Sequence, residues 1–488
     1  MHSAFFDYDK DGDLDLYLLV NPAAYEHQVN SSNPRKLDGQ SISNDRLYRN
    51  EGNGKFTDVS LEAGILVEGY GLGVAISDIN NDSWPDIYIS NDFVGNDILY
   101  INKGDGTFKD EITEYMNHTS YAGMGNGVSD IDNNGNPDIM VLDMRPEDNE
   151  RQKLIISSTG YDRFQMMLNA GYQAQYSRNT MQLNMGEGEF SEIGNMAGIS
   201  STDWSWSTLL ADYDNDGYKD IYITNGFLRD LGNLDYIHYQ NIYDNPLGER
   251  EAKINQKLKS IQELPPAKLV NYSYRNSGNT TFEDTSEDWG IVDASCSNGA
   301  AYADLDNDGD LDLVVNNVNQ PAFVYENRTL NDTINHYLRI QLVGKQGNLQ
   351  GIGAKVKITT KTSTQFEENF LSRGYESSTD PILHFGLGKE NVVERIEIWW
   401  PDNSYQNLTG IKADQQLLIK QTDQVTLESK ETIGQDKTWF KSTTEKSKLD
   451  FNHIEDGMID FKIQPILPHM ASRNGPGIAV GDYNADGL

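Results

Sequence analysis

Short apolar segments alternate with acidic, glycine-containing loops along most of this chain. Five of the loops run directly into a strand-like segment: LDLYLL, PDIYIS, PDIMVL, KDIYIT and LDLVVN. A second apolar segment precedes some loops, as in GVAIS before Asp78 and TLLA before Asp212. Strand–Gly/Asn turn–strand segments, typical of hairpins, follow at 47–60, 99–110, 183–193 and 272–286. The pattern therefore predicts a repeating unit of four short strands built around an acidic loop.

The acidic loops share a nine-residue pattern, with oxygen-bearing side chains at positions 1, 3, 5 and 9 and usually Gly at position 6. Ca²⁺ takes six to eight oxygen ligands, and Gly allows the sharp turn that brings them together. An EF-hand is excluded, because its Glu at position 12 is replaced by Leu18 in the first copy and Val315 in the fifth. An ordinary acidic turn could explain one copy. Five copies with the same offsets favour calcium.

We expect the side chains at positions 1, 3, 5 and 9, and the backbone carbonyl of position 7, to hold Ca²⁺. The five loops supply Asp7, Asp9, Asp11, Asp13 and Asp15; Asp78, Asn80, Asp82, Trp84 and Asp86; Asp130, Asp132, Asn134, Asn136 and Asp138; Asp212, Asp214, Asp216, Tyr218 and Asp220; and Asp304, Asp306, Asp308, Asp310 and Asp312. A sixth, interrupted copy contributes Asp482, Asn484 and Asp486. The second and third loops contain Asn and Pro, and the second has Ser83 in place of Gly, so these two sites are expected to be weak or empty.

The spacing of the loops indicates a propeller or solenoid. The shortest step between loop starts, from 78 to 130, is 52 residues, enough for four short strands and their turns. Longer steps contain insertions at 149–172 and 246–262 that lack strand alternation, and Ile254, Leu258 and Ile261 follow one face of an amphipathic helix. We interpret both as helical excursions. They are either a first candidate for a ligand-binding surface or a structural patch over the sheets.

The loops and the LYxNxGxGxF hairpins resemble the FG-GAP/VCBS repeats of integrin-α-type β-propellers. GNLQGIGAKV at 347–356, SRGYESS at 372–378, LHFGLG at 383–388 and IEIWWPDNSYQNL at 396–408 resemble the ASPIC/UnbV domain of the cartilage acidic protein-like family. TDWSW at 202–206 and VLDMRPED at 141–148 are similar to members from Bacteroidetes-type bacteria. The resemblance implies an all-β fold and a surface or secreted protein, and it implies no particular chemistry.

Three regions are expected from these observations. Residues 1–330 form an incomplete propeller of about five blades, 335–421 an ASPIC/UnbV domain, and 422–488 a linker and the start of a second propeller. Asp7 leaves no room for a strand before the first loop, and the last copy is cut off. We therefore expect an internal fragment of a longer protein, with exposed sheet edges and apolar faces that favour association.

Composition narrows the function. A net charge of −36 argues against a nucleic-acid partner, because phosphate binding needs a cationic face. The single cysteine, Cys296, excludes an internal disulfide framework, so calcium is expected to stabilise the fold in place of disulfides. No apolar run reaches the roughly 20 residues that span a bilayer. Together with the family resemblance, this favours an extracellular or bacterial cell-surface location.

A non-catalytic binding scaffold is the favoured function, with an extracellular glycan or protein as ligand. WPD at 400–402 is no phosphatase loop, since Tyr302 stands where a Cys-x5-Arg motif starting at Cys296 needs Arg. HExxH and GxSxG motifs are absent from the sequence. The alternative is part of a secreted polysaccharide-acting enzyme, with its active site in the insertions or outside this chain. Inserted aromatics such as Tyr161, Tyr236 and Tyr243 suit ligand binding or packing between blades.

Overall fold

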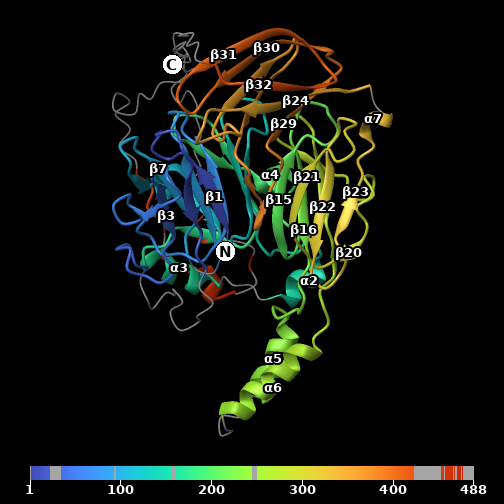
Figure 1. The fold of residues 1–488 in the computed structure, drawn as a ribbon. Coiled ribbons are helices and arrows are strands. Elements are labelled where there is room, and N and C mark those ends of the chain that lie inside the picture. Colours follow the sequence, from blue (N-terminus) through green and yellow to red (C-terminus); the bar gives the residue numbers. More distant parts are fainter. Residues whose placement is uncertain are drawn as a thin grey trace, which may run out of the picture. The chain divides into compact units, whose positions relative to one another are not determined.

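The structure is a computed structural model that describes residues 2–21, 35–92, 95–155, 160–243, 250–332 and 334–422, and short stretches between 452 and 475. The chain divides into two compact units, Met1–Leu427 and Glu428–Leu488. Strands dominate the first unit, which confirms the β-rich fold expected from the sequence (Figure 1). The second unit contains two short 3₁₀ helices, Asp460–Lys462 and Ala471–Arg473. The interrupted sixth loop, with Asp482, Asn484 and Asp486, lies outside the described residues.

Five antiparallel sheets follow one another, each built around one acidic loop, and the strands of each sheet pair in chain order. The first sheet contains β1 (Ser3–Phe6), β2 (Asp15–Leu18), β3 (Arg46–Asn50) and β4 (Phe56–Asp58), and the second contains β5 (Gly71–Ser77), β6 (Asp86–Asn91), β7 (Ile98–Asn102) and β8 (Phe108–Asp110). The third contains β10 (Asn126–Ser129), β11 (Asp138–Val141), β13 (Thr180–Asn184) and β14 (Phe190–Glu192). The fourth contains β15 (Ser205–Ala211), β16 (Asp220–Asn225), β18 (Tyr272–Asn276) and β19 (Phe282–Asp284), and the fifth contains β21 (Ser297–Ala303), β22 (Asp312–Asn317) and β23 (Phe323–Tyr325).

One expectation about the first sheet is wrong. A strand does precede the first loop, because β1 pairs with β2 from Ser3↔Leu18 to Phe6↔Asp15. Four residues suffice, since Phe6 is fully buried against the neighbouring sheet and anchors the strand. The other loops also lie between the first two strands of their sheets, so the strand–loop–hairpin unit inferred from the sequence is confirmed.

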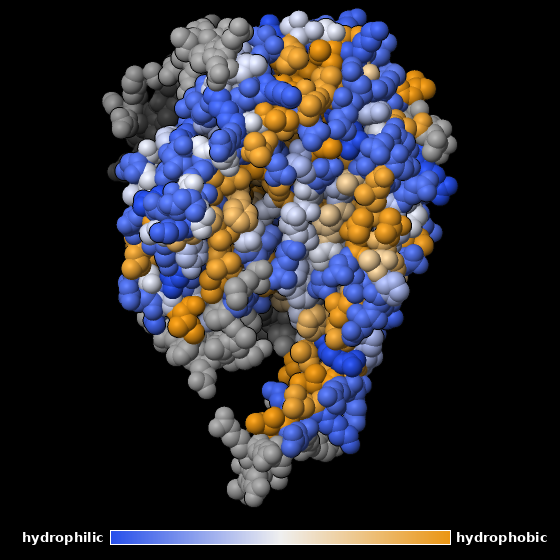
Figure 2. Space-filling view, in the orientation of Figure 1, coloured by the Kyte–Doolittle hydropathy of each residue, from blue (hydrophilic) through white to orange (hydrophobic). Residues whose placement is uncertain are grey.

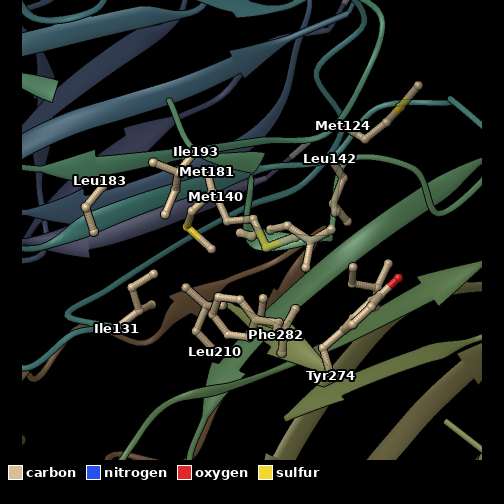
Figure 3. Close-up of a cluster of buried hydrophobic side chains, with 14 of the residues drawn as sticks. Met124, Ile131, Met140, Leu142, Met181, Leu183, Ile193, Leu210, Tyr274 and Phe282 are labelled. Atoms are coloured by element: carbon tan, nitrogen blue, oxygen red, sulfur yellow. The ribbon is translucent and has the colours of Figure 1, made fainter. Parts of the chain in front are cut away.

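The five sheets pack face to face in chain order, and an apolar cluster fills each of the four interfaces. Figure 3 shows the cluster between the third and fourth sheets, where Met140 and Met181 meet Leu210 and Phe282. Strands of the inner sheets are therefore buried on both faces, as β6 and β16 are along their whole length. Such strands read as continuous apolar runs rather than alternating ones.

The two outermost sheets each leave one face uncovered. Burial alternates along β1, and Phe5, whose partner across the sheet is Leu16, is 53% exposed. In the fifth sheet Val324, the partner of Val314, is 65% exposed. The series of sheets is thus open at both ends within the part of the chain that the structure describes.

Helices and two small sheets interrupt the repeats. The parallel pair is β9 (His118–Ser120) with β12 (Ala174–Tyr176), and the antiparallel pair is β17 (Leu269–Val270) with β20 (Ala294–Ser295). The helices are α1 (Ile112–Tyr115), α2 (Asn149–Leu154), α3 (Tyr161–Asn169), α4 (Gly194–Ala197), α5 (Leu234–Tyr243), α6 (Arg250–Glu263) and α7 (Thr329–Asp332). Both expected helical insertions are present, and α5 and α6 project away from the sheets (Figure 1). Within the described chain, none of the helices has the length and apolar character needed to cross a bilayer.

The remaining described strands of the first unit form two further sheets and a small hairpin. One sheet contains β26 (Thr364–Glu368), β25 (Lys355–Thr359), β30 (Val392–Trp399) and β31 (Tyr405–Lys412), and the other contains β29 (Ile382–Gly388), β24 (His336–Val343) and β32 (Gln415–Lys420). The hairpin pairs β27 (Ser372–Arg373) with β28 (Ser377–Ser378). Ile340, Val356, Phe385 and Ile398 belong to the core that both sheets share. Residues at one edge of this sandwich, among them Arg339 on β24 and Lys355 on β25, contact the acidic loops.

Candidate metal centres in the acidic loops

Each acidic loop is held in the same tight backbone conformation. Position 4 has a φ between 57° and 63° in all five loops, and position 6 has a φ between 78° and 100°. Gly occupies position 6 in four loops because this left-handed region is unfavourable for residues with a Cβ. In the second loop Ser83 adopts it with a φ of 78°. The Gly preference at position 6, visible in the sequence, is thereby explained.

The first-position aspartate organises the loop by accepting backbone hydrogen bonds. Its Oδ2 accepts from the N–H of position 6, as Asp130 does from Gly135 (2.9 Å) and Asp212 from Gly217 (2.8 Å). In the second to fifth loops its Oδ1 accepts from the N–H of position 5. In the first loop Asp7 Oδ1 is buried and has no hydrogen-bond partner. An unpaired buried carboxylate oxygen is costly, and a cation would satisfy it.

Carboxylate oxygens converge within 4.8 Å of one another in four of the loops. In the first, third and fourth loops the group joins positions 1, 3 and 9; these groups are Asp7, Asp9 and Asp15; Asp130, Asp132 and Asp138; and Asp212, Asp214 and Asp220. In the fifth loop it joins Asp304, Asp306 and Asp308, without Asp312. The third loop therefore keeps three convergent acids despite Asn134.

The remaining predicted ligands lie next to these groups and hold the loops. Position 5 accepts from the N–H of position 7 in every loop; the pairs are Asp11–Asp13, Asp82–Trp84, Asn134–Asn136, Asp216–Tyr218 and Asp308–Asp310. In the second loop Asn80 replaces the third-position acid and donates to Asp82 Oδ2 (2.9 Å). Of the acids at positions 1, 3 and 9, which converge in the first, third and fourth loops, the second loop therefore has only Asp78 and Asp86.

Burial, together with repulsion from nearby carboxylates, opposes the ionisation of several first- and ninth-position aspartates. Burial, with nearby aspartates adding to it, raises the pKa of Asp7 to about 7, of Asp15 to about 8, of Asp130 to about 7 and of Asp212 to about 8. A bound divalent cation would reverse this preference. Oxygen-only donors, a spare Asp7 oxygen and clustered negative charge fit Ca²⁺, a hard cation that takes carboxylate and carbonyl ligands.

An asparagine that the sequence interpretation left unassigned supports the ninth-position aspartate. It ends the third strand of the first four sheets and lies two residues beyond the third strand of the fifth. Its N–H donates to Oδ1 of that aspartate at 2.8–2.9 Å; the residues are Asn50, Asn102, Asn184, Asn276 and Asn327. Oδ2 of the same aspartate accepts from the N–H of position 2, as Asp138 does from Ile131 (2.9 Å). The sequence does show this asparagine, as the Asn of the LYxNxG hairpin pattern. Its contact with the loop could not be predicted because the two are far apart in sequence.

Basic side chains of the C-terminal sandwich reach two of the loops. Arg339 on β24 places Nη1 2.6 Å from Asp304 Oδ2, with both side chains buried. Lys355 on β25 places Nζ 2.5 Å from Asp78 Oδ2 and 3.1 Å from Glu368. A protein cation therefore already neutralises part of the charge in the second and fifth loops. The second loop is the weakest candidate site on both grounds.

The hairpin of β27 and β28 touches the first strands of several sheets. Ser372 Oγ donates to the Val74 carbonyl on β5 (3.0 Å), and the Gly374 N–H donates to the Asn126 carbonyl on β10 (3.0 Å). The Tyr375 N–H donates to Ser207 Oγ on β15 (3.1 Å). The SRGYESS segment thus joins strands that belong to three different repeats.

Comparison with protein families matches two parts of the chain. A model described as FG-GAP-like repeat matches residues 7–89, 78–141 and 169–223, which cover four of the acidic loops. A model described as ASPIC and UnbV matches residues 344–426, which cover most of the C-terminal sandwich.

Curated relatives share sequence over most of the chain. Cartilage acidic protein 1 of Homo sapiens is 24% identical over 351 residues, covering 71% of this chain and 43% of the relative, and that of Xenopus tropicalis is 25% identical over 354 residues, covering 71% and 44%. The match thus spans less than half the length of these relatives. Among solved structures, the V. cholerae biofilm matrix protein Bap1 aligns with a TM-score of 0.29 and 9% identity over 84% of this chain and 62% of its own, a likeness that carries no argument.

Proposed function

For a chain that carries FG-GAP-like repeats and an ASPIC and UnbV domain and is homologous to cartilage acidic protein 1, we propose a calcium-stabilised, non-catalytic scaffold. It acts outside the cytoplasm, at a cell surface or after secretion, and binds a glycan or protein ligand there. Its strongly negative charge suits a solvated extracellular surface and disfavours nucleic acid.

The observation that carries this proposal is the recurrence of one loop geometry with convergent carboxylates. Within the described residues, four loops each assemble three acidic groups, although desolvation and repulsion oppose that arrangement. Ca²⁺ bound there links the first two strands of its sheet, because positions 1 and 9 lie beside the end of one strand and the start of the next. At a free concentration of 100 times Kd, each independent site adds about 2.7 kcal/mol to the free energy of unfolding.

The ligand surface is assigned to the projecting pair of helices α5 and α6. Large apolar side chains are exposed there, among them Ile254 at 50% and Leu258 at 51%, and Figure 2 shows apolar surface along this projection. Solvent-exposed excursions from a rigid scaffold are common sites of recognition. A glycan array probed with the intact chain and with a Leu258→Ser variant tests the ligand class.

Thermal unfolding in millimolar Ca²⁺ and in chelator tests the calcium part of the proposal. We expect a large calcium-dependent rise in Tm and four tightly bound ions by isothermal titration, one for each convergent group, with the second loop as a weaker fifth site. The paired change Asp9→Asn and Asp132→Asn removes the third-position acid from two loops and lowers the count by two.

The matched control is Glu283→Gln, which neutralises an exposed acid on β19 outside every loop. It leaves both the ion count and the calcium-dependent rise in Tm unchanged. Absence of calcium binding and of any Tm shift in the unmodified chain would show that the acidic loops are turns alone.

A further inference from the structure

Neighbouring loops are joined by the side chains of the repeat asparagines. Besides bonding its own loop, the amide nitrogen of four of them donates to the position-2 carbonyl of the preceding loop. These bonds are Asn102 to Tyr8 (2.9 Å), Asn184 to Ile79 (2.9 Å), Asn276 to Ile131 (2.9 Å) and Asn327 to Tyr213 (2.8 Å). Asn50, in the first sheet, bonds only within its own repeat, to Leu14 at 3.1 Å.

These contacts form one continuous hydrogen-bonded path. The Asn276 N–H donates to Asp220 in the fourth loop, its side chain donates to the Ile131 carbonyl, and the Ile131 N–H donates to Asp138 in the third loop. The same three steps recur between every neighbouring pair of loops. The ninth-position aspartates at both ends are at most 3% exposed, and Asn102, Asn184 and Asn276 are at most 2% exposed. Water cannot readily replace these bonds.

We propose that the repeat asparagines couple adjacent loops, so that filling one loop with calcium raises the calcium affinity of the loop before it. The inference rests on the proposed function. A cation that orients Asp220 also fixes Asn276, and through Ile131 it positions Asp138 before the third loop binds its own ion. Loops ordered in advance bind more tightly because less conformational freedom is lost on binding. Hydrogen bonds in a buried series also reinforce one another.

Position-6 glycine amides give a separate readout for every loop except the second, which has Ser83 there. Gly12, Gly135 and Gly217 each donate to the first-position aspartate of their own loop, in the first, third and fourth loops. Calcium titrations of deuterated, ¹⁵N-glycine-labelled protein therefore yield one Kd for each loop that has this glycine. The Asp214→Asn and Asp216→Asn pair disables the fourth loop, and the Kd reported by Gly135 is compared with and without that pair.

Disabling the fourth loop is expected to raise the Kd of the third by about 5-fold, near the low end of typical couplings between sites. In an Asn276→Ala background the same change leaves the Kd of the third loop unaltered. A purely structural role for Asn276 would weaken both loops and keep the ratio. Asn50→Ala is the control: it weakens the first loop and leaves the coupling of the third and fourth intact.

If Asn276→Ala does not fold, Asn327→Ala gives the equivalent test between the fifth and fourth loops, because Asn327 is only half-buried. An unchanged ratio in the asparagine variant, or independent loops in the unmodified protein, overturns the coupling while leaving calcium binding in place. Glycine amides that do not respond to calcium overturn the proposed function and the coupling together.

Discussion

Two left-handed residues in each loop decide which side chains fit. Gly at position 6 was predictable, since the nine-residue pattern shows it. The left-handed residue at position 4 was not, because Lys10, Asn81, Asn133, Asn215 and Asn307 carry no common glycine signal. Asn tolerates this conformation better than other residues with a Cβ, which accounts for its recurrence.

Replacing Ser83 by Gly should stabilise the protein by about 0.5–1 kcal/mol, because the relieved strain exceeds the entropy that Gly adds to the unfolded chain. Chemical denaturation without calcium measures the change. Ser83→Ala keeps a Cβ at the same φ of 78° and should give no gain. Equal effects of the two substitutions would contradict the strain argument.

Calcium-free protein should lose stability as pH rises from about 4 to about 8. The folded-state pKa of Asp15 and of Asp212 is raised to about 8, above the ordinary value near 4, so the folded state holds protons that the unfolded state has released. Calcium affinity should rise over the same interval, since binding displaces those protons. Melting curves at pH 5 and pH 8 with and without calcium measure both trends. A calcium-free Tm that increases with pH would contradict the assignment.

Strands β24 and β25 place their cations where a divalent ion would also act. Local pattern predicted the strands, loops and hairpins of the repeats, since each depends on nearby residues. It could not predict that Arg339 reaches Asp304, or that Lys355 reaches Asp78 across 277 positions, because nothing local records such contacts. The asparagine bridges were missed for the same reason.

Arg339→Met should cost about 3–5 kcal/mol in calcium-free protein, because it leaves the buried Asp304 carboxylate without its ionic partner. The cost should shrink in saturating calcium, which supplies another positive charge to the fifth loop. Denaturant titrations under both conditions measure the difference. Arg395→Met is the comparison, since Arg395 is 52% exposed and its pairing with Glu397 at 3.7 Å contributes little. An equal cost with and without calcium would show that calcium does not compensate for the loss of the Arg339 charge.

Within the described part of the first unit, the packed sheets end in two apolar faces, marked by Phe5 and Val324. Because both faces expose large apolar side chains, we expect them to favour association between copies of the chain. The sequence predicted self-association but could not show which faces remain open. The structure identifies the exposed residues on those faces. Strand β6 is buried on both sides because a sheet packs against each of its faces, whereas β1 has a neighbouring sheet on one face.

Phe5→Lys combined with Val324→Lys should reduce self-association and change the free energy of unfolding by no more than about 0.5 kcal/mol, since both side chains are exposed. Sedimentation velocity over a range of concentrations measures the association. Leu258→Lys, on α6 and away from the end faces, should leave it unchanged. Association that persists in the double variant would place the contact elsewhere.

The β27–β28 hairpin also determines when the contacts between repeats can form while the chain is being synthesised. Ser372 bonds the Val74 carbonyl across 298 positions. At ribosomal speeds of about 5–20 residues per second, roughly 15–60 s separate the appearance of the two groups. Until the hairpin has been synthesised, the Val74 and Asn126 carbonyls lack these hydrogen-bond donors. A nascent chain can therefore stack its sheets early, but the hairpin joins the first strands of these sheets only after about 375 residues have emerged.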